Sequence, residues 1–138
     1  MKYLCDTNFI LRYLLADNPQ MFAKVKEIFD QAKTGKVILI IEQAVFTEVI
    51  FVLSSFYKVP KDTITQILSD LLTYKGISSE KEVFALALDY YSKYNMHVVG
   101  CLLLAKNKLA SIPVLTFDEQ LNDYLQKDSI RAAAKEIK

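Results

Sequence analysis

The sequence predicts an α/β fold in which a mostly parallel sheet carries helices on both faces. Short apolar segments that are typical of buried strands alternate with longer segments whose apolar residues recur at helical spacing. The segment from Val37 to Ile41 is continuously apolar and rich in β-branched residues, as expected of a strand covered on both faces. Because strands that are separated by helices usually pair in parallel, this alternation favours the α/β class.

Each predicted element in the first half of the chain has a local signal at its boundary. A short buried strand from Lys2 to Cys5 is predicted to end at the polar triplet Asp6-Thr7-Asn8. The helix that follows, from about Phe9 to Leu15, is broken by Asp17-Asn18-Pro19, because proline disfavours a helical conformation in the residue before it. Apolar residues at helical spacing then predict helices from Phe22 to Gly35, from Gln43 to Tyr57 and from Pro60 to Gly76.

The second half of the chain is predicted to be helical apart from one strand near its end. A helix from about Glu80 to Tyr94 follows Ser79, whose side chain suits the N-cap position. Val98 to Leu109 is apolar on all sides, which is typical of a buried helix. Pro113 to Phe117 is predicted to be a strand and Asp118 to Tyr124 a short helix, whereas Ser129 to Lys138 has no clear pattern.

The composition indicates one folded domain over residues 1–138, in the cytoplasm. A chain of 138 residues with 52% hydrophobic and 24% charged residues is typical of a single globular domain. The net charge of +1 argues against a strongly basic, sequence-independent nucleic-acid binder, although a metal ion or a local basic patch can still bind phosphate. We find no signal peptide and no apolar run that would span a membrane, so Cys5 and Cys101 are expected to be free thiols.

Three acidic residues are candidates for a functional site. Asp6 and Asp118 each follow a predicted strand, and ligands of open parallel sheets bind at the carboxyl ends of the strands. The alternative for either residue taken alone is an N-cap of the following helix. Glu48 lies on a predicted helix with apolar residues three and four positions away on both sides, so its charge needs a cation, a hydrogen-bond network or a salt bridge. If the three carboxylates converge, Mg²⁺ or Mn²⁺ would offset their mutual repulsion.

The segments around these acids resemble the motifs of the PIN-domain family, and especially its VapC-like toxins. Tyr3 to Leu15 resembles the first motif, Thr47 to Leu53 the second and Val114 to Asp118 the fourth, while Asn95 to Ala105 occupies the place of the third. The resemblance covers nearly the whole chain, with the motifs in order. It implies a three-layer α/β/α fold with about five strands, and metal-dependent hydrolysis of RNA by the toxin of a toxin–antitoxin pair.

The resemblance also implies roles for individual residues. Asp6 would bind Mg²⁺ or Mn²⁺ directly, Glu48 would hold the metal or its water, and Asp118 would act mainly through water. Thr7, Asn8 and Thr116 would orient the carboxylates or the phosphate.

The partners that the resemblance implies are an RNA substrate, a cognate antitoxin and a second copy of the chain. Apolar positions on the second-motif helix and the helix after it are the predicted dimer surface: Phe51, Phe56, Ile64 and Leu68.

One position departs from the family pattern, because Gly100 stands where the family has an aspartate that normally binds the metal. A glycine inside a helix costs about 0.5–1 kcal/mol relative to alanine, so it needs a reason. One alternative is that Gly100 allows another helix to pack closely. We interpret it as a lost carboxylate that cripples a ribonuclease. The competing hypothesis is a catalytically inactive PIN fold that binds an antitoxin or RNA.

Other groups of residues favour simpler interpretations. A zinc site built from Cys5, His97 and Cys101 would lack the usual second ligand pair. A phosphatase that forms an aspartyl phosphate is also disfavoured, because Asp6-Thr7-Asn8 lacks the second acid that such enzymes generally have. Arg12, Lys106 and Lys108 are candidate phosphate contacts, with a solvated helix end as the favoured alternative for the two lysines. Three tyrosines have the helical spacing of core residues and are interpreted as packing: Tyr90, Tyr91 and Tyr94.

Overall fold

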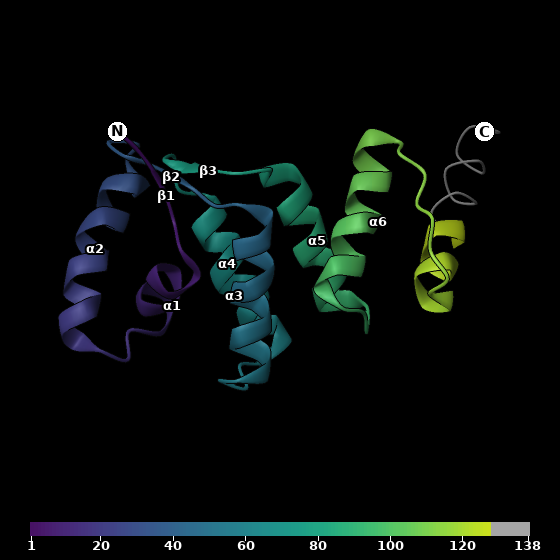
Figure 1. Ribbon diagram of the computed structural model, residues 1–138, viewed down its shortest axis with the longest axis horizontal. Helices are drawn as coiled ribbons and strands as arrows, with labels where there is room; N and C mark the ends of the chain where they lie inside the picture. The colour runs from purple at the N-terminus through teal and green to yellow at the C-terminus, as the bar shows by residue number, and fades with distance from the viewer. Residues whose placement is uncertain (128–138) are drawn as a thin grey trace. The chain divides into compact units, whose positions relative to one another are not determined.

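The computed structural model describes residues 1–127, and the chain divides into two compact units that meet at residues 81 and 82. The first unit, Met1–Lys81, contains a sheet and four helices, whereas the described part of the second is helical (Figure 1). The predicted α/β class is therefore confirmed. The prediction of one domain over residues 1–138 stays a prediction, and residues 129–138 lie outside the described part.

The sheet of the first unit is parallel, as predicted, and has three strands rather than about five. The strands β1 (Lys2–Leu4), β2 (Ile38–Ile40) and β3 (Ile77–Ser78) are arranged in that order. Tyr3 is paired with Leu39, and Leu39 with Ile77. Because β2 is the central strand and is covered by helices, Leu39 is almost completely buried. The prediction that the first strand is buried is wrong, because β1 is an edge strand and Leu4 is 71% exposed.

Four helices pack around this sheet: α1 (Thr7–Leu15), α2 (Pro19–Lys33), α3 (Gln43–Ser55) and α4 (Lys61–Leu72). The break predicted at Asp17-Asn18-Pro19 is confirmed. Ala16 ends α1 in the left-handed conformation, with φ of 50°, and the Asn18 side chain accepts a hydrogen bond of 3.1 Å from the backbone N–H of Met21. Proline in the first turn completes the start of α2.

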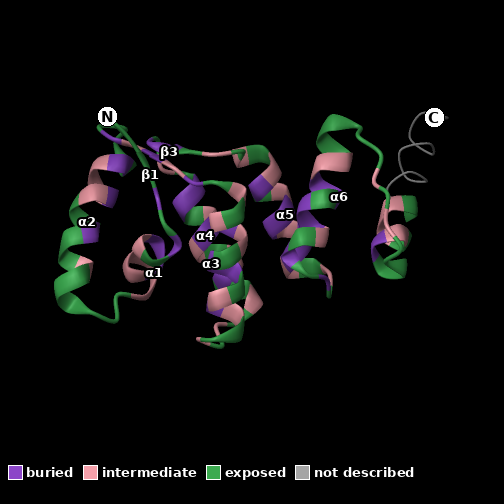
Figure 2. Cartoon of the chain, in the orientation of Figure 1, coloured by how far each residue is buried: buried purple, intermediate pink, exposed green. Residues whose placement is uncertain are grey.

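The interior of the first unit is formed by the inward faces of these helices, which Figure 2 shows as stripes of buried positions. α1 packs against α2 and α3, and α3 packs against α4. Phe29, Leu53 and Ile64 have no exposed surface. The burial of Ile64, and of Leu68 at 3% exposure, corrects the predicted dimer surface, because these two residues belong to the core.

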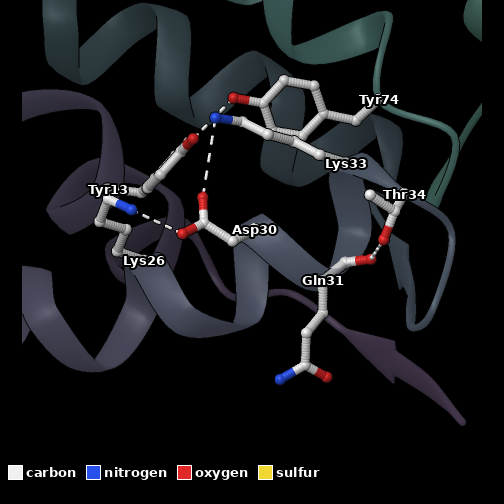
Figure 3. A network of polar contacts seen from close by, with 7 residues as sticks. All are labelled: Tyr13, Lys26, Asp30, Gln31, Lys33, Thr34 and Tyr74. Atoms are coloured by element: carbon white, nitrogen blue, oxygen red, sulfur yellow. Dashed lines mark hydrogen bonds and ion pairs between the residues drawn. The ribbon is translucent and has the colours of Figure 1, made fainter.

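A polar and aromatic network holds α1, α2 and the turn after α4 together (Figure 3). The hydroxyl oxygens of Tyr13 and Tyr74 are 2.6 Å apart, and the ring of Tyr13 stacks on Phe29 with centroids 4.0 Å apart. Burial and the hydrogen bond to Tyr74 raise the pKa of Tyr13. The ammonium of Lys33 lies 5.4 Å from the centre of the Tyr74 ring and 3.7 Å from a carboxylate oxygen of Asp30.

Gly76 lies in the connection between α4 and β3, where the backbone passes too close to other backbone atoms for a residue with a Cβ atom. A Cβ atom at this position would collide with the carbonyl oxygen of Val37 and lie 2.8 Å from that of Ala32. The N–H of Gly76 donates to the Ala32 carbonyl at 2.7 Å, and its carbonyl accepts from the N–H of Leu39, also at 2.7 Å. The predicted end of the helix at Gly76 is corrected, because α4 ends at Leu72, whereas Gly76 joins the end of α2 to the sheet.

The described part of the second unit contains α5 (Lys81–Lys93), α6 (Val98–Ala110) and a helical segment over residues 119–127. The prediction that the 98–109 helix is buried on all sides is wrong. Cys101, Leu104 and Ala105 are fully buried, whereas Val99 is 53% exposed. Figure 2 shows both buried and exposed positions along α6. A helix that is apolar all round gives no periodic signal for its buried face.

Two further local predictions are corrected by the structure. Residues 113–117 form no strand: Leu115 and Phe117 are fully exposed, and no neighbouring strand supplies backbone hydrogen bonds in the described chain. Ser79 is not an N-cap, since its buried hydroxyl has no hydrogen-bond partner among residues 1–127.

Over residues 1–127, every helix is too short or too polar to cross a lipid bilayer.

Candidate functional site

Asp6 occupies the position between β1 and α1, and its carboxylate has no partner in the described part of the chain. Its backbone has the extended conformation of an N-cap, and its carbonyl accepts the N–H of Ile10 at 3.3 Å. The side chain, however, makes no capping hydrogen bond. It is exposed and has no ion pair within the described residues. The N-cap alternative therefore fails for Asp6, and its carboxylate is available to a ligand.

An open pocket of about 380 Å³ lies beside Asp6 in the first unit. It is lined by residues from β1, α1, α2 and β2: Tyr3, Leu4, Asp6, Phe9, Ile28 and Leu39. Asp6 is the only charged residue among them, so the pocket combines apolar walls with one carboxylate. Of the two residues after Asp6, Thr7 is buried in the first turn of α1, whereas Asn8 is exposed.

Glu48 is exposed on α3, and this corrects the environment predicted for it. The buried face of α3 is formed by Phe46, Val49, Ile50 and Leu53. Glu48 shares the opposite side with Ala44 and with Phe51, whose side chain is 64% exposed. No salt bridge or hydrogen bond to the Glu48 carboxylate exists within residues 1–127, so the salt-bridge alternative is not observed.

Gly100 lies in the first turn of α6, three residues after the N-cap His97, and not in the middle of the helix. A Cβ atom built at Gly100 would lie 3.0, 3.1 and 3.9 Å from the Cγ, Sδ and Cε atoms of Met96. These three nearest atoms belong to one flexible side chain and not to the backbone of another helix. The structure therefore gives no support to close helix packing as the reason for this glycine.

Asp118, unlike Asp6, caps the helix that follows it with its side chain. One of its carboxylate oxygens, Oδ1, accepts the backbone N–H of Leu121 at 2.9 Å, at the start of the 119–127 helix. The N–H of Asp118 donates to Oγ1 of Thr116 at 3.0 Å, and the Thr116 carbonyl accepts the side-chain amide of Asn122 at 3.1 Å. The N-cap interpretation is thus confirmed for Asp118. Thr116 supports the turn that presents it.

Arg12 has a structural role that sequence analysis did not identify. Its Nη1 donates to Oδ1 of Asp17 at 2.7 Å, and its Nη2 donates to the hydroxyl of Tyr57 at 3.0 Å. Each terminal nitrogen therefore has a protein partner, while the guanidinium keeps further N–H donors, so the phosphate contact suggested for this residue stays a prediction.

The zinc interpretation finds no support in the surroundings of the cysteines. Cys5 and Cys101 are buried free thiols, and burial raises the pKa of the Cys5 thiol to about 11. Because a metal binds the thiolate, this environment is unfavourable for a zinc ligand.

The packing role predicted for the tyrosines holds for the buried Tyr90 and Tyr91, while the half-buried Tyr94 stacks on Tyr124 with centroids 4.0 Å apart.

The predicted site residues are divided between the two units. Asp6, Thr7, Asn8 and Glu48 belong to the first unit, and Gly100, Thr116 and Asp118 belong to the second. In neither unit, as far as it is described, do three or more His, Cys, Asp or Glu side chains form a group that could hold a metal ion. The convergence of Asp6, Glu48 and Asp118 on one cation stays a prediction.

Comparison with known protein families gives a match that spans both units. Residues 3–125 match the model of the PIN domain, and the match includes position 100 and all three candidate carboxylates. No curated protein and no solved structure matches the chain.

Proposed function

Because the chain belongs to the PIN-domain family, whose members are generally metal-dependent nucleases, we propose that it is a metal-dependent endoribonuclease impaired by the glycine at position 100. The observation that carries this proposal is the free carboxylate of Asp6, at the carboxyl end of β1. An aspartate between a strand and a helix normally caps the helix. Here the backbone takes the capping conformation, while the carboxylate is exposed and makes no bond to any residue of the 1–127 range.

The donor groups fit a hard divalent cation by their chemistry. Mg²⁺ and Mn²⁺ prefer oxygen ligands, and the carboxylates of Asp6 and Glu48 have no other partner among residues 1–127. Asp118 uses only Oδ1 in its capping bond, so Oδ2 remains to receive a cation or a water. We infer that Asp6 and Glu48 would bind the metal directly and that Asp118 would act from its outer shell.

The glycine at position 100 removes both a negative charge and an oxygen ligand from this set. Cation affinity in oxygen sites depends on the number and charge of the ligands, so we expect the metal to bind weakly. When bound, a divalent cation supplies the charge that stabilises a phosphodiester during hydrolysis. The chain's own contribution is to hold the carboxylates: Thr7 is fixed in the first turn of α1, and Thr116 orders the turn before Asp118.

A second candidate function is that of an inactive PIN fold that binds RNA or an antitoxin. The observation in its favour is the environment of Gly100, where the Met96 side chain lies against the position at which a carboxylate would begin. If the chain no longer catalyses hydrolysis, no carboxylate is required at position 100, and Met96 can fill the space that this side chain would take.

The remaining parts of the proposal concern the cellular role. By family resemblance, the chain would be the toxin of a toxin–antitoxin pair that acts in the cytoplasm on RNA and is held by a cognate antitoxin. A homodimer is supported by two exposed aromatic residues at the end of α3, Phe51 and Phe56, at 64% and 76% exposure.

A ribonuclease assay on matched variants tests the proposal. The chain as given should cleave RNA weakly or not at all in Mn²⁺, and Gly100→Asp should raise cleavage and Mn²⁺ affinity together. Adding Asp6→Asn to Gly100→Asp should abolish the gain, because the amide removes an anionic ligand and nearly preserves shape. Adding Asp62→Asn, which changes an exposed aspartate in the first turn of α4, is the control and should leave the gain intact. If Gly100→Asp cleaves no better than the chain as given in saturating Mn²⁺, position 100 is not a lost ligand.

A further inference from the structure

Met96 is held firmly in front of α6. Its backbone N–H donates to the carbonyl of Tyr94 at 2.9 Å, and its own carbonyl accepts the thiol of Cys101 at 3.7 Å. Its side chain is buried, with a residue exposure of 7%. Met96 directly precedes the N-cap His97, so it is placed to cover the first turn of the helix, where an apolar residue often packs against the fourth helical position.

The side chain of Met96 lies close to the place where the first atoms of any side chain at position 100 would be. Carbon atoms in ordinary contact lie about 3.5–4.0 Å apart. A Cβ at Gly100 would lie 3.0 Å from Cγ and 3.1 Å from Sδ of Met96, so the methionine must move if position 100 carries even one side-chain carbon.

We propose that Met96 is a positioning residue that closes the first turn of α6, so that a carboxylate at position 100 becomes fully effective only when Met96 is also replaced. The metal-binding part of this inference rests on the proposed function. The effect that supports it is steric: Met96 lies so close to a Cβ atom at position 100 that it displaces a longer side chain from its preferred path.

The inference predicts that positions 96 and 100 are energetically coupled. Methionine is flexible and needs to shift by only a few tenths of an ångström, but the shift disturbs its contacts in a buried position. Substitutions at two residues in contact are not additive for this reason, whereas substitutions at residues without a shared contact usually are.

Thermal unfolding without metal tests the coupling separately from any nuclease activity. Alanine is preferred to glycine in helices, so Gly100→Ala should raise the melting temperature by about 2–4 °C in the background of Met96→Ala. In the background of Met96 it should give no gain or a loss. Leu109→Ala is the matched control, because Leu109 lies on the same helix at 47% exposure and nine residues from position 100, and its effect should add to that of Gly100→Ala. Met96→Val provides a second background that removes less of the buried side chain.

Calorimetric titration with Mn²⁺ tests the consequence for the site. The Met96→Ala/Gly100→Asp protein should bind Mn²⁺ on the order of tenfold more tightly than Gly100→Asp alone, in the range found for groups that orient metal ligands. Met96→Ala alone should bind no better than the chain as given.

Additive melting temperatures in both the Met96→Ala and Met96→Val backgrounds would overturn the inference, as would equal Mn²⁺ affinities of the single and double variants that carry Gly100→Asp. If the two positions are coupled but neither Gly100→Asp variant binds Mn²⁺, the proposed function is contradicted and the packing of Met96 on Gly100 is supported.

Discussion

The guanidinium of Arg12 and the hydroxyl of Tyr57 are joined by a hydrogen bond of 3.0 Å between residues that are 45 positions apart in the sequence. Arg12 lies in α1 and Tyr57 follows α3, so this bond fixes the two helices relative to each other within the first unit. Asp17 completes the arrangement by pairing with the other terminal nitrogen of Arg12 at 2.7 Å. The Arg12 side chain is only 15% exposed, so water would not easily replace a hydrogen-bond acceptor that the guanidinium had lost.

Tyr57→Phe should destabilise the first unit by about 1.5–3 kcal/mol, the usual range for a hydrogen bond to a charged group. The measurement is urea unfolding followed by circular dichroism. Tyr3→Phe is a suitable control, because the hydroxyl of the exposed Tyr3 has no hydrogen-bond partner in the described chain. Equal stabilities of the two variants would mean that the Arg12–Tyr57 bond contributes nothing measurable.

Gly76→Ala should be strongly destabilising, by about 3 kcal/mol or more, because the added carbon collides with a backbone carbonyl that cannot move without disrupting the sheet. Lys75→Ala, at an exposed neighbouring position, should change the free energy of unfolding by less than about 0.5 kcal/mol. A Gly76→Ala protein with the stability of the parent would show that the connection between α4 and β3 is looser than described.

Asp118 allows its capping role to be separated from a role in catalysis. Asp118→Ala should cost about 1 kcal/mol through loss of the cap, whereas Asp118→Asn should keep most of the stability, since asparagine caps as well as aspartate. Placed beside Gly100→Asp, Asp118→Asn should nevertheless reduce Mn²⁺-dependent cleavage of RNA. Full cleavage by that double variant would remove Asp118 from the proposed site.

The exposed aromatic pair on α3 predicts self-association. Light scattering at tens of micromolar should give the mass of a dimer, and Phe51→Ser/Phe56→Ser should shift it toward a monomer without loss of helix content, because both side chains lie outside the core. Thr63→Ala, on the exposed side of α4, serves as the control. A parent chain that remains monomeric at these concentrations would contradict the prediction.

The helices of the first unit were predictable because their boundaries are encoded locally. Asn18 and Pro19 start α2 by side-chain capping and by a fixed backbone angle, and both effects depend only on neighbouring residues. The strand predicted at residues 113–117 shows the limit of this reasoning. Apolar residues such as Leu115 and Phe117 favour a strand, but a strand also needs a neighbour to receive its backbone hydrogen bonds, and sequence pattern does not supply one.

The candidate site was predictable in its residue types and less so in their surroundings. Asp6 and Asp118 have the same local pattern, a strand-like segment followed by a helix, yet only Asp118 turns its carboxylate to the helix N-terminus. That choice depends on side-chain rotation. Glu48 was expected to be surrounded by apolar neighbours, but it lies on the outer side of α3, because an almost entirely apolar helix does not reveal which face is covered.

The left-handed residue at the end of α1 marks a position at which a substitution could stabilise the protein. Ala16 ends α1 with φ of 50°, and Ser111 ends α6 in the same way with φ of 56°. A side chain with a Cβ atom is strained in this conformation, and glycine is not, so replacement by glycine at either helix end recovers about 0.5–1 kcal/mol. Neither residue belongs to the proposed metal site. A scaffold stabilised in this way could therefore carry costly substitutions at positions 96 and 100, and the glycines themselves would leave the proposed metal site unchanged.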